Sequence, residues 1–497
     1  MLNQHWDVVN ENTSSGFCGT ATTISALYSG RNCLEVMQMT ASTNAREGSQ
    51  YQHPVHPDIL PMSDNPYEDF RYFYRDGMPL RPAPKRRTQR PGWSTLRHNL
   101  FDRWHTVADE WEGYTSFQTK LLDDHMWQTD ETGSRLAEAF KRDGAKKSRA
   151  DFETALNEGI DKVVDPSPEL VDFFAEVENI PDWIDLEAAE RGRVAYYNVT
   201  PSAELLSIGF AYWATTMEDR TSAATGETAM FEIESFTRII ETVKFFVDLG
   251  KKGVFDRYSD GLKAAVRVRL LHAQANRGLE KLWGPDHYNE FGYPIGSSFL
   301  VSGEGWFALM PIGVDEFFGR PHSGEEWDDV AMYWAWVLYL MGAEERLIPK
   351  TGDEMRKMTD FIYANGGYSS SYHVRVATAL MGILEDLDPK MPAQVLGALS
   401  LIIGDEDTKF MVKGSRFEGT PYLHWKIAFL LKAKAEAAIY RVRDKLPRAQ
   451  AAKAKKAADG KPPWSDVFKQ IEDYVAEKAP HVKAEYTLHD ESKEGLR

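Results

Sequence analysis

One histidine of this sequence lies in the middle of a segment whose composition favours a helix. Residues 262–283 are rich in alanine, leucine and arginine, which are good helix formers, and His272 lies near their centre. At helical spacing the residues that share its face are Ala265, Val268, Arg269, Ala275, Asn276 and Leu279. Small side chains beside a histidine let a flat macrocycle approach the helix, and a neutral imidazole on a rigid helix is a common proximal ligand of haem iron. The alternative is a histidine that is hydrogen-bonded in the core.

Three arginines in the same segment are suited to binding carboxylates. Arg267, Arg269 and Arg277 carry the forked guanidinium group that pairs well with a carboxylate. If a haem lies beside His272, we expect its propionates to pair with some of them.

A second helix, expected over residues 231–249, carries polar groups among bulky apolar ones. Arg238, Glu241, Thr242 and Phe245 fall on one face at offsets of three, four and seven residues. Burying an arginine, a carboxylate and a hydroxyl together is costly unless they pair or serve a site. The alternative is an Arg238–Glu241 ion pair on a partly exposed face.

Composition and missing motifs exclude several classes of protein. The sequence has no Cys-x-x-Cys-His haem attachment motif, His-Glu-x-x-His zinc helix, Glu-x-x-His di-iron pair, phosphate-binding P-loop or Gly-x-Ser-x-Gly elbow. Its two cysteines, Cys18 and Cys33, make neither a disulfide framework nor a zinc-ligand set. The net charge of −17 argues against a nucleic-acid partner and against broad adsorption to anionic lipid. These absences leave chemistry that a cofactor supplies.

Helical periodicity runs nearly throughout residues 151–445 and predicts an all-α fold. Besides the two helices above, it predicts helices that begin at Pro168 and Pro201 and helices over 328–341, 391–403 and 422–443. Strand signals are weak, and the best are Ser298–Val301 and Ala484–Thr487. We expect a single large helical domain, packed in the manner of the globins.

Three parts follow along the chain. Residues 1–150 are expected to form an N-terminal arm with accessory helices, 151–445 the main helical domain, which holds both segments described above, and 446–497 a basic linker, an amphipathic helix and a charged tail. The amphipathic helix has Val467, Phe468, Ile471, Tyr474 and Val475 on one face, and we expect it to dock on the rest of the chain rather than on a second subunit. No signal peptide and no apolar run of membrane-spanning length is visible, which predicts a cytoplasmic protein and leaves peripheral contact with a membrane open.

The two helix motifs together resemble a known family. Arg238-x-x-x-Thr242, followed by Arg267-x-Arg269-Leu-Leu-His272-Ala, is similar to the haem b oxygenases typified by latex-clearing protein, the rubber oxygenases, whose domain is shared with the fungal mycophenolic-acid-pathway oxygenase. The similarity extends over about residues 165–400 and includes the segments 291–295, 333–336 and 342–349.

The resemblance implies a cofactor and roles for individual residues. It makes His272 the axial ligand of the iron in a non-covalent haem b, and it places Arg238 and Thr242 in the haem pocket. Val268 and Arg269, which share the face of His272, are expected to contact the haem as well. Arg238, Glu241 and Thr242 are the expected catalytic residues.

One position departs from the family pattern. Latex-clearing proteins have a lysine immediately before the threonine, and this sequence has Glu241, which cannot replace an ammonium group. Lys244, one turn further on, is an alternative residue for the place of the family's lysine on the distal side of the iron. Glu241 itself is a candidate distal acid or base. The family's catalytic carboxylate lies upstream of the arginine, where Glu227, Glu232 and Glu234 are alternatives.

The resemblance thus predicts a haem b-dependent oxygenase that uses O2 to cleave a C=C bond in a polyisoprenoid or another lipophilic small molecule, as a monomer or a homodimer. The 14 Trp, 21 Tyr and 25 Phe residues suffice to line an apolar pocket as well as a core. Two alternatives stay open: a haem peroxidase or hydroxylase of secondary metabolism, and a helical binding protein that has no cofactor.

Overall fold

Every regular element in the described part of the chain is a helix. The structure, a computed structural model, describes residues 94–100, 125–217, 235–293, 295–303, 307–365 and 372–449, together with 451, 469, 473, 476 and 477. The predicted all-α fold is therefore confirmed. All of these residues belong to one compact unit, which spans residues 53–497. Among the described helices, none combines the length and the hydrophobicity that crossing a membrane requires.

The helices are joined by short loops and by single turns of 3-10 helix. In chain order they are α3 (Ser94–Leu100), η3 (His125–Trp127), α5 (Glu131–Asp143), α6 (Ala145–Glu158), η4 (Ile160–Lys162), α7 (Pro168–Glu178), α8 (Leu186–Tyr196), α9 (Pro201–Met217), α12 (Ser235–Leu249), α13 (Asp260–Phe291), α14 (Ser297–Gly303), α15 (Leu309–Phe318), α16 (Gly324–Leu340), η6 (Glu345–Leu347), α17 (Gly352–Asn365), α18 (His373–Leu387), α19 (Met391–Leu399), α20 (Gly404–Met411) and α21 (Leu423–Arg443).

Several helices begin where the sequence provides a capping side chain. Ser167 accepts a hydrogen bond from the backbone of α7, and Pro168 supplies the first helical residue. Asp185 caps α8 in the same way. At α16, Ser323 and Glu326 form a reciprocal capping box, which satisfies two backbone N–H groups at once.

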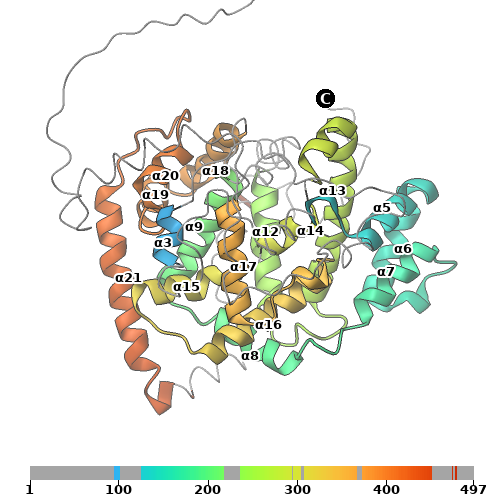
Figure 1. Cartoon of the computed structure of the whole chain (residues 1–497), viewed down its shortest axis with the longest axis horizontal. Coiled ribbons are helices and arrows are strands. Elements are labelled where there is room, and N and C mark those ends of the chain that lie inside the picture. The colour runs from blue at the N-terminus through green and yellow to red at the C-terminus, as the bar shows by residue number, and fades with distance from the viewer. Residues whose placement is uncertain are drawn as a thin grey trace, which may run out of the picture. The chain divides into compact units, whose positions relative to one another are not determined.

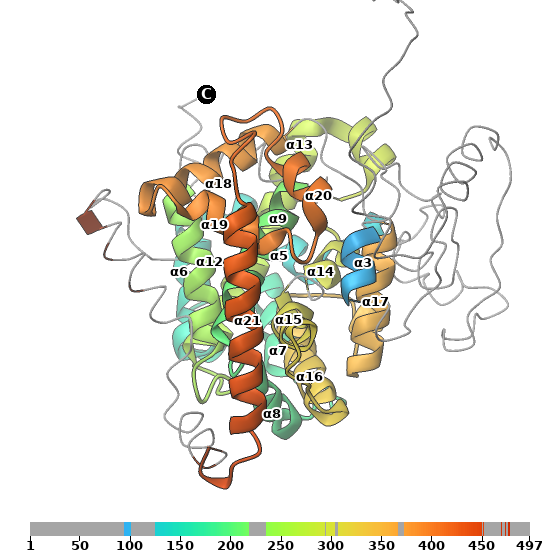
Figure 2. The ribbon, with the colours of Figure 1, turned by 90° about the vertical axis from the view of Figure 1, so that its left-hand side faces the viewer.

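The helices form two groups on either side of α12. On one side α5, α6 and α7 pack together, and α5 also packs on α13 (Figure 1). On the other side α9 packs against α15, α18, α19 and α21, and Figure 2 shows α21 running along the front of this group. Helix α12 contacts both groups, because it packs on α13 and on α18. Helix α12 therefore lies between the two groups of helices and has one of them on each side.

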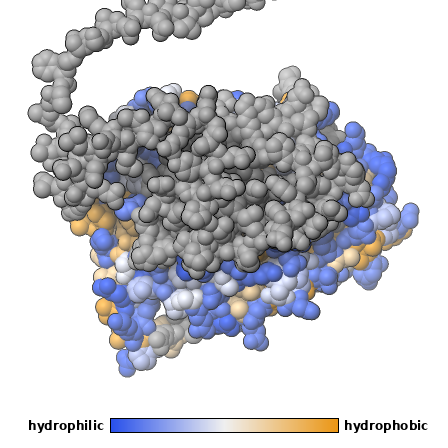
Figure 3. All heavy atoms as spheres, in the orientation of Figure 1, coloured by the Kyte–Doolittle hydropathy of each residue, from blue (hydrophilic) through white to orange (hydrophobic). Residues whose placement is uncertain are grey.

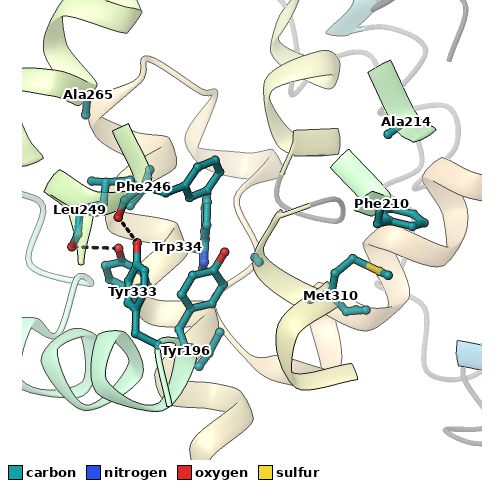
Figure 4. Packing of buried hydrophobic residues seen from close by; sticks show 14 of the residues in the cluster. Tyr196, Phe210, Ala214, Phe246, Leu249, Ala265, Met310, Tyr333 and Trp334 are labelled. Carbon is teal, nitrogen blue, oxygen red and sulfur yellow. Dashed lines mark hydrogen bonds between the residues drawn. The ribbon is translucent and has the colours of Figure 1, made fainter. Parts of the chain in front are cut away.

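Helices α8 and α16 approach each other very closely because Gly192 has no side chain. A Cβ atom at this position would lie 1.8 Å from the carbonyl oxygen of Asp329. One turn of α8 after Gly192, the ring of Tyr196 contacts that of Trp334 on α16, with centroids 5.5 Å apart. The ring of Phe307 stacks on Trp334 at an interplanar angle of 12°. Figure 4 shows Tyr196, Tyr333, Trp334 and Phe246 gathered in this aromatic core.

The sequence-based strand over Ser298–Val301 is wrong. These residues lie in α14, whose first turn is closed by hydrogen bonds from Phe299 N and Leu300 N to Gly296 O, at 3.0 and 3.1 Å. A single β-prone segment among helices has no neighbouring strand to pair with, so its backbone satisfies its hydrogen bonds locally instead.

The other expectations for the elements are mostly confirmed. Helices begin at Pro168 and Pro201 as predicted, and α13, α16, α19 and α21 lie where periodicity placed them. Helix α13 continues past its predicted end at 283, through a kink at Gly284 (φ 81°). The strand expected over Ala484–Thr487 lies outside the described residues, and the division at residues 150 and 445 stays a prediction.

Candidate functional site

The C-terminal end of α12 is held by hydrogen bonds from two other helices. Tyr197 of α8 donates to Phe246 O at 2.6 Å, and Tyr333 of α16 donates to Leu249 O at 3.2 Å (Figure 4). Arg193 donates to the next carbonyl, that of Gly250, at 2.6 Å. The last carbonyls of a helix have no partner inside the helix, so these donors satisfy groups whose burial would otherwise be costly.

Both tyrosines remain donors over the whole physiological pH range. Burial raises the pKa of Tyr197 and of Tyr333, and the neighbouring tyrosine hydroxyl contributes to the rise at Tyr197. Helix α12 is consequently fixed in position along its C-terminal half.

Helix α13 is fixed by a buried arginine one turn before His272. The Arg269 side chain is 1% exposed and donates to both carboxylate oxygens of Asp130, at 2.6 and 2.7 Å. Its Nη2 also donates to Glu176 at 2.8 Å, and its guanidinium lies 4.7 Å from the ring centroid of Phe173. Burial lowers the pKa of Arg269, but the two carboxylates raise it by more, so the group stays charged.

Two further contacts fix the rest of α13. Arg267 pairs with Glu153 of α6 through two hydrogen bonds, at 2.9 and 2.6 Å. Asn276 donates to Ile295 O at 2.6 Å and accepts from Ile295 N at 2.8 Å, which joins the helix to the turn before α14. The central turns of α13 are therefore held at both ends of the segment that carries His272.

His272 is half-buried on the fixed part of α13. Val268 and Ala275, at offsets of four and three residues on the same face, are half-buried as well, and Leu279 is buried. The residues that point away from His272, namely Val266, Leu270 and Ala273, are all under 3% exposed, and so are Ala265 and Arg269 at the edge of its own face. His272 thus lies on a strip of small and medium apolar side chains that is less enclosed than the rest of its helix.

The residues predicted on α12 have different surroundings. The Glu241 side chain is buried at 7% exposure, whereas Thr242 is exposed. The side chain of Arg238 lies outside the described side chains, and the upstream alternatives Glu227, Glu232 and Glu234 lie outside the described residues. Because α12 packs directly on α13, the buried carboxylate of Glu241 and the imidazole of His272 belong to two contacting helices.

Lys244, the alternative to the family's lysine, is directed along its own helix. It forms a short ion pair with the buried Asp248 one turn further on, and Lys251 binds the other oxygen of Asp248 at 2.7 Å. This pairing draws Lys244 toward the C-terminal end of α12 and away from the turn that carries Glu241.

The three arginines expected to bind propionates differ in what they already bind. Arg267 binds Glu153, and Arg269 binds Asp130 and Glu176, so that only Nη1 of Arg269 lacks a hydrogen-bond partner. Arg277 is half-buried and forms no ion pair with the described residues. The carboxylates of the protein thus already occupy most of the donors that the sequence pattern assigned to a cofactor.

The residues around His272 nevertheless fit a haem. The imidazole lies in the middle of a rigid helix and has the small side chains of Val268 and Ala275 on its own face. An axial ligand needs a helix that is fixed in position, and this condition is met here. Among the described residues no group of three or more His, Cys, Asp or Glu side chains is arranged to hold a metal ion directly.

A buried polar network that sequence reasoning missed lies far along the chain from His272. Asp315 accepts hydrogen bonds from Thr200 at 2.5 Å, from Arg320 at 2.7 Å and from His322 at 3.2 Å. Arg320 also binds Asp444 at 2.8 Å, just beyond the end of α21. These contacts join the start of α9 to the ends of α15 and α21, so the network serves the fold. Only the run of polar residues after α15, residues 319–323, signalled it in the sequence.

The comparisons with known proteins support the fold. The structure is similar to one solved as latex clearing protein LCP in the closed state, with a TM-score of 0.51 and 16% identity, over 63% of this chain and 84% of that one. No family model and no curated protein sequence matches. At this identity the likeness shows a shared arrangement of helices, and the described part of this chain has the helical fold of latex clearing protein.

Proposed function

We propose that this chain is a haem b-dependent oxygenase that binds the iron through His272 and uses O2 to cleave a C=C bond in an isoprenoid or another lipophilic substrate. The observation that carries the proposal is the position of His272, half-buried at the centre of a helix that buried ion pairs hold in place. The helical fold shared with latex clearing protein supports it, since the sequence motifs around His272 resemble the same family.

Each group on the two helices has a role in this proposal. Arg269, anchored by Asp130 and Glu176, positions the turn of α13 that carries the imidazole. Val268 and Ala275 allow a flat cofactor to lie against the helix. When bound, a haem supplies the activation of O2, which no side chain of the protein can perform alone.

Glu241 is the group we assign to proton transfer. Its carboxylate is buried on α12, the helix that packs directly on α13, where His272 lies. We assign it the removal of an allylic proton from the substrate and the return of the same proton before the products leave, so that Glu241 is regenerated in each turnover. In the overall reaction the C=C bond is broken and one oxygen atom of O2 ends on each carbon, so that two carbonyl fragments account for all atoms.

An absorption spectrum tests the cofactor and its ligand. Protein expressed with a haem precursor should show a Soret band, and the band should be lost in His272→Ala. His424→Ala is the matched control, because His424 is exposed on α21, and it should keep the band. If the folded wild-type protein stays colourless after haemin is added, the proposal fails and a binding protein without a cofactor takes its place.

One observation favours a second reaction of the same cofactor. Glu241 stands where latex-clearing proteins have a lysine, and a distal carboxylate also suits a hydroxylase or a peroxidase. Product analysis by mass spectrometry separates the two: cleavage yields paired carbonyl fragments, and hydroxylation yields a single heavier product.

A further inference from the structure

Helix α21 exposes a row of large apolar side chains to solvent along its whole length. Six of them, which we call the α21 outer face, are between 53% and 67% exposed: Leu423, Ile427, Leu431, Ile439, Val442 and Leu446. From Leu423 to Val442 the row extends for about 29 Å at 1.5 Å per residue, and Leu446 lies just beyond the end of the helix. Figure 3 shows hydrophobic side chains at the edge of the molecule where α21 runs in Figure 1. Exposed apolar surface of this extent marks an interaction site.

The helix cannot turn this face inward, because its other side is attached to the core. Ala433 and Ala437 are fully packed against the neighbouring helices. Glu436 accepts a hydrogen bond from Ser202 N at 2.9 Å, and Asp444 binds Arg320 at 2.8 Å. These contacts fix which side of α21 faces the other described helices.

Basic side chains lie among and beside the exposed apolar ones. At about 100° per residue, Lys434 and Arg441 fall on the side of the face that holds Leu423, and Lys432 and Arg443 lie just beyond the opposite edge. Lys432 and Arg443 lie 3.6 and 4.0 Å from the carboxylates of Glu436 and Asp444, which also bind Ser202 N and Arg320. Although the whole chain has a net charge of −17, helix α21 therefore carries more positive than negative side chains around its apolar face.

We propose that the α21 outer face docks on an anionic membrane surface. An apolar face bordered by lysine and arginine is typical of helices that lie in the plane of the lipid headgroups, where the basic side chains reach the phosphates and the apolar ones enter the acyl region. The proposal concerns this helix alone and stands whether or not the chain binds haem. It is compatible with the overall negative charge, because attraction to anionic lipid acts within a Debye length of the basic border.

The width of the face argues against a single helix as its occupant. At about 100° per residue, the six side chains spread over about 160° of the circumference, which is far wider than the seam of a coiled coil. If the apolar positions of the C-terminal segment, 467–475, are helical, they cover only about 12 Å of the row of about 29 Å. A second copy of α21 would bring the same basic borders together, and like charges repel.

Vesicle binding of the full chain tests the proposal. The protein should co-sediment with large unilamellar vesicles of phosphatidylcholine mixed with phosphatidylserine, more weakly with phosphatidylcholine alone, and less as salt is added.

Leu431→Glu and Ile439→Glu should each weaken binding about tenfold or more. Val164→Glu is the matched control, because Val164 is 86% exposed on a loop elsewhere, and it should bind like the wild type. Replacing Lys434 or Arg441 with Gln, which removes one positive charge, should weaken vesicle binding roughly fivefold in each case.

Several outcomes would overturn the proposal. One is a wild-type protein that does not bind mixed vesicles, and another is an equal loss in the Val164→Glu control. If binding appears only after residues 465–497 are deleted, the tail covers the face. If sedimentation velocity shows a dimer that Leu431→Glu makes monomeric, a second copy covers it. Circular dichroism melting of each variant excludes unfolding as the cause of lost binding.

Discussion

Asp130 binds Arg269 through both carboxylate oxygens and at the same time caps helix α5. Arg269 Nε and Nη2 donate to it at 2.6 and 2.7 Å, and the backbone N–H of Gly133 donates to Oδ1 at 3.0 Å. One side chain thereby connects the start of α5 to the turn of α13 that precedes His272. The close approach requires a glycine on α16's end, since a Cβ at Gly342 (φ 79°) would lie 2.6 Å from Asp130 and 2.7 Å from Arg269 Nε.

We expect Asp130→Ala to be among the most destabilising substitutions in this region. It leaves Arg269 buried with one exposed partner, Glu176, and removes the cap of α5. Breaking a buried pair in this way costs about 3–5 kcal/mol in the free energy of unfolding. Urea denaturation followed by circular dichroism measures it. Asp172→Ala is the control, since its pair with Arg135 is about half exposed and should cost less than about 1 kcal/mol.

Gly192→Ala should destabilise the α8–α16 contact. The added Cβ would overlap the backbone of Asp329, which cannot move without shifting α16, and overpacking of this severity costs about 3 kcal/mol or more. Thermal melting reports the effect. In contrast, Gly278→Ala on α13 meets open space and should stabilise its helix by about 0.5–1 kcal/mol. A wild-type melting temperature for Gly192→Ala would contradict the close approach of the two helices.

His322 should make the stability of the protein depend on pH. Burial lowers its pKa, but the carboxylate of Asp315, hydrogen-bonded to Nε2, and that of Glu326, 3.5 Å from Nδ1, together raise the pKa above its ordinary value. The raised pKa means that the folded state binds the proton more tightly than the unfolded state. The contribution is therefore fully present below the unfolded pKa of about 6.5 and is lost as pH rises through the folded pKa. In His322→Gln this loss of stability with rising pH should disappear from urea titrations, and its persistence would assign the pH dependence to another group.

Glu241→Gln should leave haem binding intact and slow the cleavage of the substrate. Glutamine keeps the size of the side chain and removes its capacity to take up a proton, so the Soret band should persist while product formation falls about 100-fold or more. Oxygen consumption with a polyisoprenoid substrate measures the rate. Glu385→Gln, on the exposed side of α18, is the matched control and should keep wild-type activity. Unchanged turnover in Glu241→Gln would remove Glu241 from the proposed mechanism, and the upstream carboxylates would take its place.

Much of the fold follows from local patterns in the sequence. Helical periodicity and the prolines Pro168 and Pro201 in a first turn are local signals. They placed the starts of α7 and α9, and the bounds of α16 and α21, within a few residues of those observed. The same kind of signal placed His272 in the middle of a long helix. These features need only residues within a turn or two of one another, which is why a single sequence suffices to predict them.

The partners of buried charges were decided by the tertiary structure. Asp130 lies 139 residues from Arg269 in the sequence. No local pattern shows that the Asp130 carboxylate binds the Arg269 guanidinium, for which the sequence analysis predicted a haem propionate as partner. The same holds for Ser298–Val301, whose β-prone residues fold into α14 because no strand lies beside them. It also holds for α21, where periodicity predicted a helix, and only packing on α9, α15 and α19 showed which apolar residues face outward. Long-range contacts select among the arrangements that local propensity permits, and they do so through burial and charge pairing that become defined only when the helices pack.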